Sequence, residues 1–322
     1  MKDKAVRNLL NIHDLPTPKD ERWKYTNLPR AVPDGLTQQD TREEIIHIKR
    51  GENCEQPVDI LWTGEEGTIH QPKLSITLEE GAQLTVIERF TGVGNYWQNM
   101  QTEITVGKNA RLNHIRVIED SAAAINTNMV SISADQDSVY SGFSLNLGAK
   151  MQRHDIHAIL NGANGEVSFN GLNLLGGDQH GDTTILIEHA APHCRSNQFY
   201  RTILDDKARG VFQGKVHVHQ IAQKTDGYQL SNAILLSDKA EMDTKPELEI
   251  YADDVKCSHG ATTGQLDDEP LFYLRSRGLS EGQARMLLLE AFIAEVIVKI
   301  DNETLEQDVA EKAKTWLSNA LS

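Results

Sequence analysis

The sequence has few cysteines. Its 322 residues contain only Cys54, Cys194 and Cys257, and no two of them are spaced as CxxC or CxxxC. An odd number of widely separated cysteines argues against a disulfide framework and favours a reducing compartment. Three thiols also cannot complete a four-cysteine zinc or iron–sulfur site. A site of that kind would need His, Asp or Glu ligands, or a second chain.

Nucleotide-binding and hydrolase motifs are also missing. No GxxxxGK[ST] loop is present, and the nearest segment, GVFQGKV at 210–216, has the wrong spacing and no hydroxyl for magnesium. No GxGxxG, GxSxG or HExxH motif occurs either. Nucleotide binding by this chain is therefore disfavoured. If the function consumes ATP, another subunit is expected to contain the nucleotide-binding site.

Long apolar runs and excess positive charge are absent too. The most apolar segment, 284–300, contains Arg285, Glu290, Glu295 and Lys299, and the initial segment MKDKAVRNLLNIHDLP lacks the apolar stretch of a signal peptide. The formal net charge is −15, which argues against nucleic acid and anionic membranes as partners. We expect a soluble, cytoplasmic protein.

Strand patterns fill residues 45–263. Short runs with alternating apolar and polar residues are separated by Gly, Asn and Asp. They are LSITL (74–78), QLTVIERF (83–90), EITVG (103–107), RLNHIRVI (111–118), SFNGLNLL (168–175), TTILIEH (183–189), KVHVHQIA (215–222) and ELEIY (247–251). The turns recur in kind, with equivalent alanines at Ala82 and Ala110 and again at Ala208 and Ala240. The sequence separation between the alanines of each pair indicates a loose repeat that contains no helix. Such a repeat favours a β-solenoid, and a β-sandwich is the alternative.

Helical patterns lie at both ends. Val6, Leu9, Leu10 and His13 have helical spacing before Pro16 and Pro18 interrupt it. After residue 263 three helices are predicted. The first follows Asp267 and runs to Arg277, with Gly278 as its stop; the second is capped by Ser280 and runs to about Ile300; the third covers about 302–320. We therefore divide the chain into an N-terminal helical and irregular segment (1–44), a β-body (45–263) and a C-terminal helical domain (264–322).

Cys257 and His259 form the densest candidate site. They lie in VKCSHGAT, where the strand pattern gives way to helices. On an extended chain, residues two apart face the same way, so a thiolate and an imidazole can ligate one metal. Lys256 is expected to lower the pKa of the thiol. The alternative is a structural cysteine beside a solvent-facing histidine.

Other histidines give weaker signals. His217 and His219 are two apart on a predicted strand and either chelate a metal or belong to a surface row with Lys215 and Ile221. His154 and His157 are three apart, which places them on opposite faces of a strand. His193 and Cys194 follow Pro192 in a predicted turn and form only a weak ligand pair.

Three segments resemble a known family. Residues 245–286, KPELEIYADDVKCSHGATTGQLDDEPLFYLRSRGLSEGQARM, and residues 212–251 resemble the C-terminal core of the SufB/SufD family of iron–sulfur cluster assembly proteins. LPTPKDERWKYTNL at 15–28 resembles the N-terminal signature of the SufD branch, as does KCSHGAT followed by LFYLRSRG. Family members usually have a longer helical part before this signature than the segment 1–14 provides.

The resemblance implies a right-handed parallel β-helix with a helical C-terminal domain. It implies a non-catalytic scaffold subunit that pairs with a SufB-like chain through the end of the β-body and with a SufC-like ATPase through the helical domain. Cys257 and His259 would lie at the SufB interface and share a transient iron or iron–sulfur cluster with it, none being bound stably by this chain alone. The apolar residues expected to contact the ATPase are Leu271, Phe272, Leu274, Phe292 and Ile293. The isolated chain is open to homodimer formation, and a metal- or cysteine-dependent enzyme on a β-solenoid is the alternative function.

Overall fold

The structure is a computed structural model that describes residues 10–12, 14–39 and 41–321. The helix predicted around Val6, Leu9, Leu10 and His13 falls outside the described residues except for Leu10, whose side chain is buried. The helical elements among the described residues up to 36 are a 3-10 turn, η1 (Glu21–Trp23), and one short helix, α1 (Leu28–Ala31).

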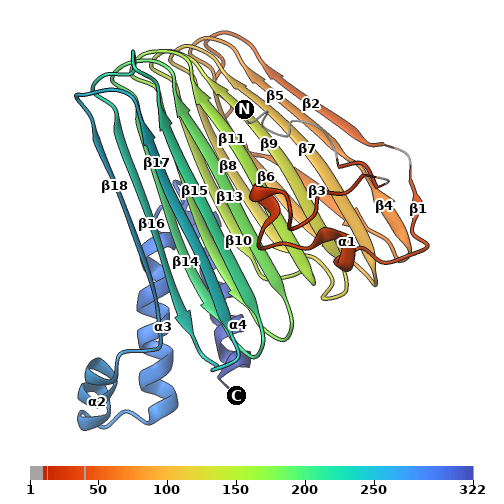
Figure 1. Cartoon of the computed structure of the whole chain (residues 1–322), viewed down its shortest axis with the longest axis vertical. Coiled ribbons are helices and arrows are strands. Elements are labelled where there is room, and N and C mark those ends of the chain that lie inside the picture. Colours follow the sequence, from red (N-terminus) through yellow and green to blue (C-terminus); the bar gives the residue numbers. More distant parts are fainter. Residues whose placement is uncertain (1–9, 13, 40, 322) are drawn as a thin grey trace.

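Two parallel sheets form the body. The ten-stranded sheet contains β1 (Thr37–Gln38), β2 (Glu43–Ile48), β4 (Thr68–His70), β5 (Lys73–Leu78), β7 (Tyr96–Val106), β9 (Ile125–Ala134), β11 (Met151–Leu160), β13 (His180–His189), β15 (Arg209–Val218) and β17 (Glu241–Ile250). The eight-stranded sheet contains β3 (Val58–Gly64), β6 (Gln83–Gly92), β8 (Arg111–Glu119), β10 (Val139–Asn146), β12 (Glu166–Leu175), β14 (Arg195–Leu204), β16 (Asp226–Leu235) and β18 (Lys256–Gly264). The chain alternates between the sheets, which makes a solenoid of about eight coils (Figure 1).

The strand register confirms the solenoid and excludes the sandwich. Gln83 pairs with Arg111 and Arg209 pairs with Glu241, both in parallel. The predicted spacings, from Ala82 to Ala110 and from Ala208 to Ala240, are therefore single coils. Each of the predicted runs contributes to a strand, although 215–222 is strand only as far as Val218. Several of the predicted turns contain Asn or Asp at positive φ, which these residues adopt more readily than most.

Alternation of side chains gives the solenoid its core. Inward-facing residues of both sheets, such as Leu112, Ile156 and Phe212, pack together between the sheets. Ala82, Ala110 and Ala208 are fully buried at the turns, where the coils stack closely. Neighbouring coils thus bury a continuous core that no single coil has alone.

Three helices follow the last strand. They are α2 (Asp268–Ser276), α3 (Glu281–Ile297) and α4 (Glu303–Ala320). The first predicted helix is α2, which Asp267 caps; Gly278 has φ +98° after it, and Ser280 with Gln283 forms a capping box for α3.

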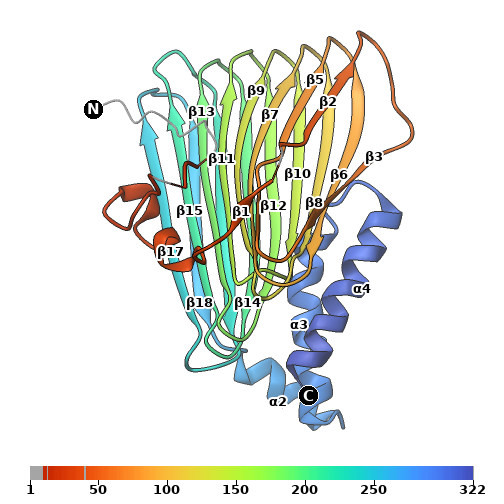
Figure 2. The ribbon, with the colours of Figure 1, turned by 90° about the vertical axis from the view of Figure 1, so that its right-hand side faces the viewer.

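The helices and the N-terminal segment lie on opposite sides of the body (Figure 2). Apolar side chains of α3 and α4 pack against outward-facing residues of β8, β10, β12 and β14 in one cluster. Residues 10–12 and 14–36 lie against the outer face of the ten-stranded sheet, with Trp23 and Leu28 buried there. Both outer faces are therefore covered in part, and the strands at the C-terminal end of the solenoid are left as edges.

Candidate functional site

The last strands of the two sheets, β17 and β18, form the C-terminal end of the solenoid. In β18, Cys257 pairs with Gly227 and His259 pairs with Gln229 of β16. The i, i+2 spacing places both side chains on one face of the strand, as predicted, and this face continues the interior of the solenoid. The structure therefore brings the predicted pair together at an end where each sheet has a free edge.

Cys257 is half-buried. Its side chain packs beside Val216 and Leu248, and a Cβ added to Gly227 would lie 3.4 Å from its Sγ atom. Burial raises the pKa of the Cys257 thiol, and the nearby Asp226 carboxylate acts in the same direction. The predicted lowering of this pKa by Lys256 is therefore wrong. Because the thiol holds its proton, a bound metal ion would have to displace that proton to gain a thiolate ligand.

His259 is exposed at the same end, and two carboxylates close to it in sequence form other contacts. Asp254 forms an ion pair with Lys224, and the Asp267 side chain accepts a hydrogen bond of 3.0 Å from the Glu269 backbone N–H. Within the described residues, Cys257 and His259 belong to no group of three ligand-type side chains. The chain thus offers two donors here, which is an incomplete set for a tetrahedral site.

The other cysteines lie apart from this site. Cys194 is fully buried, its thiol donates to the Gly162 carbonyl at 3.2 Å, and burial raises its pKa. His193 is exposed in the predicted turn at φ +62°. The burial of the Cys194 thiol argues against a ligand site shared with His193. Cys54 is half-buried and packs against the core of the solenoid.

The residues predicted to bind an ATPase fall into two groups. On α2, Phe272 is 74% exposed, and Leu271 and Leu274 are partly exposed. On α3, Phe292 is partly buried under the Arg201 guanidinium, and Ile293 is only 3% exposed within the chain's own core. Packing against the eight-stranded sheet thus accounts for Ile293, and among the five predicted residues the most exposed apolar side chain is that of Phe272 on α2.

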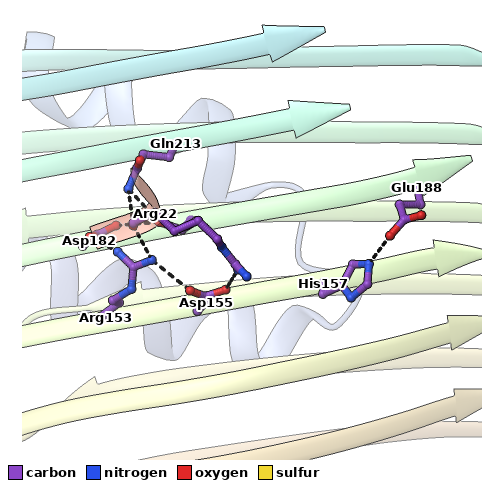
Figure 3. Close-up of polar contacts among 8 residues, drawn as sticks. Arg22, Arg153, Asp155, His157, Asp182, Glu188 and Gln213 are labelled. Carbon is purple, nitrogen blue, oxygen red and sulfur yellow. Dashed lines mark hydrogen bonds and ion pairs between the residues drawn. The ribbon is translucent and has the colours of Figure 1, made fainter. Parts of the chain in front are cut away.

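Sequence reasoning missed a buried charge cluster on the ten-stranded sheet. Arg153 and Asp182 are fully buried and form an ion pair, and Arg153 also bonds Asp155 at 2.8 Å (Figure 3). Arg22 from the N-terminal segment pairs with Asp155, and its carbonyl accepts from Arg153 at 2.8 Å. The sequence contains part of the evidence for this cluster, because Arg153 and Asp155 are two residues apart and therefore lie on the same face of a strand. Their partners lie 133 and 29 residues away.

A second buried cluster lies inside the solenoid. Glu88 accepts a hydrogen bond from Trp62 at 2.7 Å and pairs with His114 at 2.8 Å. Burial opposes ionisation of Glu88, but His114, Arg116 and Trp62 outweigh it and hold its pKa below the usual value. His154 faces this interior region while His157 on the other face contacts Glu188, as their spacing predicted. These hydrogen bonds and ion pairs hold the polar side chains in place inside the solenoid.

Within the described part of the chain, no helix combines the length and apolar character needed to cross a membrane.

The fold defines a class of protein, the parallel β-solenoid with a helical cover on one outer face. Residues 61–292 match the family model described as SUF system FeS cluster assembly, SufBD core domain. The chain is 37% identical over 271 residues to the iron–sulfur cluster assembly protein SufD of Escherichia coli (strain K12), an alignment that covers 82% of this chain and 64% of that protein. The chain belongs to the SufB/SufD family and is SufD-like within it.

Two further relatives agree. An iron–sulfur cluster assembly SufBD family protein of Synechocystis is 37% identical over 281 residues, covering 83% of this chain and 62% of that protein. The chloroplastic protein ABCI7 of Arabidopsis thaliana is 30% identical over 287 residues, covering 85% of this chain and 60% of that protein. The chain therefore spans less than two-thirds of the length of these relatives.

Proposed function

We propose that this chain is a non-catalytic scaffold subunit of a SUF iron–sulfur cluster assembly complex, working in the cytoplasm. It pairs with a SufB-like chain through β17 and β18 and with a SufC-like ATPase through α2. Iron or a nascent cluster is cargo, held between Cys257 and His259 and ligands of the SufB-like chain. The isolated chain uses the same free edges when it forms a homodimer.

One observation supports the proposed surface for pairing with the SufB-like chain. The two sheets end together at β17 and β18, and Cys257 and His259 lie side by side at that end. Free strand edges offer main-chain donors and acceptors to a second chain. Two donors from one chain and further donors from another would complete a site that neither chain holds alone.

The proposed surface for binding the ATPase is inferred from the exposed side chains of α2. Phe272 and Tyr273 of α2 are 74% and 56% exposed, and no α2 residue is buried. Exposed aromatic side chains of this kind are typical anchors of protein interfaces. The chain lacks a phosphate-binding loop, so the ATPase activity is assigned to the partner.

Reconstitution with SufB-like and SufC-like partners tests the cargo site. His259→Ala should lower the iron content of the anaerobically reconstituted complex several-fold while gel filtration shows intact assembly. Cys257→Ala should have an equal or milder effect, because partner thiolates can replace one ligand. Ser258→Ala, on the other face of β18, is the matched control. Normal iron loading in both variants would refute the shared site, and loss of assembly would assign His259 to packing.

Pull-down with the SufC-like ATPase tests α2. Phe272→Asp should reduce capture by at least about tenfold, since a charge replaces an apolar anchor. Ile221→Asp changes a similarly exposed residue in a turn of the solenoid and should leave capture unchanged. Equal capture by both variants would show that the ATPase binds elsewhere. The isolated chain should hydrolyse no ATP in either case.

A further inference from the structure

A second group of metal-ligand side chains lies on the outer face of the ten-stranded sheet. Glu188 near the end of β13 pairs directly with His217 of β15, and His219 follows His217 by two residues on the same side. His157 of β11 reaches the same carboxylate from the neighbouring strand (Figure 3). This group contains no cysteine and belongs to the sheet that does not include β18.

The contacts concentrate on one carboxylate. The Glu188 Oε1 atom lies 2.6 Å from His157 Nε2, and its Oε2 atom lies 3.2 Å from His219 Nε2. The His217 and His219 rings stack with centroids 4.6 Å apart. One ligand atom from each of Glu188, His217 and His219 lies within 4.8 Å of the other two. Three imidazoles are thus gathered around a single negative group.

The carboxylate is suited to a cation. Its two oxygens face two imidazoles, those of His157 and His219, at 2.6 and 3.2 Å. The neighbouring Glu249 is paired with Lys215 at 2.7 Å, so a competing carboxylate is already neutralised.

An ion can reach the group. Glu188 and His217 line an open pocket of about 570 Å³ that extends toward Arg22 and Lys245. The Glu188 and His219 side chains are 23% and 40% exposed. In a tetrahedral site with metal–nitrogen bonds of about 2.0–2.1 Å, neighbouring donors are about 3.4 Å apart. Small rotations of these partly exposed side chains would bring the donor atoms from their present separation to this distance.

We propose that Glu188, His217 and His219 bind one divalent first-row transition-metal ion such as Zn²⁺ or Fe²⁺, with His157 orienting the Glu188 carboxylate from the neighbouring strand. Two histidines and a carboxylate are a donor set used for zinc and for non-haem Fe(II). Mg²⁺ and Ca²⁺ are disfavoured because they require mainly oxygen ligands. The alternative is a surface row of hydrogen-bonded side chains without affinity for metal. This site does not depend on the proposed role of Cys257 and His259.

Titration of the chelator-treated full chain with Zn²⁺, and with Co²⁺ as a visible-absorption probe, tests the site. We expect one saturable site of nitrogen and oxygen ligands, without a thiolate-to-cobalt charge-transfer band. His219→Ala should weaken binding by at least about tenfold, and His217→Ala with His219→Ala should abolish it. Glu188→Gln keeps the shape of the side chain but removes its charge, and it should weaken binding as well.

Two controls separate this site from others. His47→Ala removes an exposed histidine that contacts Glu79 at 2.9 Å on the same sheet, and it should bind metal like the parent. Cys257→Ala with His259→Ala should also bind like the parent, because those residues are not part of the site. Circular dichroism and melting temperature check that each variant is folded. The proposal is overturned if no saturable binding occurs, if His219→Ala and Glu188→Gln bind normally, or if only the Cys257 and His259 variant loses binding.

Discussion

The two outer faces of the solenoid are covered in different ways. On the eight-stranded sheet, α3 and α4 pack through apolar side chains such as Leu289, Val296 and Leu317, all fully buried. On the ten-stranded sheet, residues 10–12 and 14–36 add charges to a smaller apolar cluster, and Arg153 is fully buried with its guanidinium 4.0 Å from the centre of the Trp23 ring. The helical cover buries the larger apolar cluster, and its ion pairs, such as Arg89 with Asp308, keep at least one partly exposed partner. The N-terminal cover depends also on an ion pair whose two partners, Arg153 and Asp182, are both fully buried.

This difference predicts different responses to mutation. An apolar interface loses free energy in proportion to the area and cavity that a substitution creates. A buried ion pair contributes little net stability, yet removing one partner leaves a charge without compensation. Single substitutions in the charge cluster should therefore have the larger effects, provided that the N-terminal segment stays docked.

Arg153→Met is expected to have the largest effect. It leaves Asp182 and Asp155 buried without their shared cation, which typically costs about 3–5 kcal/mol. Detachment of the N-terminal segment would let water reach the carboxylates, so trypsin should cleave near Lys19 and Lys24 much faster than in the parent. Urea unfolding and limited proteolysis measure the two consequences.

The control for Arg153→Met is Arg195→Met. Arg195 is 70% exposed and contacts Glu166 at 3.4 Å on the surface, so its loss should change the unfolding free energy by less than about 0.5 kcal/mol. If Arg153→Met were equally mild and left the proteolysis rate unchanged, the charge cluster would not hold the N-terminal segment.

Leu289→Ala tests the helical cover. Leu289 is fully buried between α3 and the sheet, and its truncation should lower the free energy of unfolding by about 3 kcal/mol. Leu287, two residues earlier, is 46% exposed, so Leu287→Ala should cost less than about 0.5 kcal/mol. Denaturant titration of both variants gives the comparison. Equal losses would mean that α3 packs through a different face.

The sequence was informative where the determining signal is local. Alternating runs predicted the strands, the Ala82 to Ala110 spacing predicted the coil length, and Ser280 and Gly278 marked the helix ends. All of these depend on neighbours a few residues or one coil away. The position of Cys257 and His259 on one face followed from period-2 alternation in the same way.

The rest depends on contacts that composition and spacing do not contain. Arg22 meets Asp155 across 133 residues, and Glu188 lies between His157 and His219, each 31 residues away. The pKa of Cys257 was predicted in the wrong direction because burial, which the local sequence does not show, raises it, and the Asp226 carboxylate on the paired strand acts in the same direction. Ile293 belongs to the core because the eight-stranded sheet covers it, which its helical pattern alone could not decide.

Acidification should loosen the polar cover more than the apolar one. His180 contacts the Thr26 hydroxyl at 2.9 Å beneath the N-terminal segment, and burial lowers its pKa. The Asp182 carboxylate opposes this lowering, and Arg209 and Arg153 reinforce it. His180 is thus neutral in the folded chain at a pH where the same residue in the unfolded chain, with a pKa near 6.5, takes up a proton.

The direction of this pH effect follows from the linkage between proton binding and folding. Below about pH 6.5 the unfolded or detached state binds more protons, so stability falls as pH falls, by at most about 1.4 kcal/mol per pH unit for this one group. Proteolysis of the N-terminal segment should speed up between pH 6.5 and 5.5 in the parent and change less in His180→Asn. His47→Asn, at an exposed position, should keep the pH dependence of the parent. A pH dependence that survives in His180→Asn would assign the effect to other groups.

Ser280→Ala should have the smallest effect, because it removes a local helix signal and no contact with the sheet. The Ser280 hydroxyl accepts from the Gln283 backbone N–H at 3.3 Å, and the Gln283 side chain accepts from the Ser280 backbone at 2.9 Å. Loss of such a cap typically costs about 1 kcal/mol. Ser276→Ala removes a hydroxyl that only donates to the Tyr273 carbonyl, and it is the matched control. Hydrogen exchange should show faster opening of the first turn of α3 in Ser280→Ala, with unchanged protection near Leu289. Loss of protection along the whole of α3 would mean that the helical cover depends on its cap as strongly as the N-terminal cover depends on Arg153.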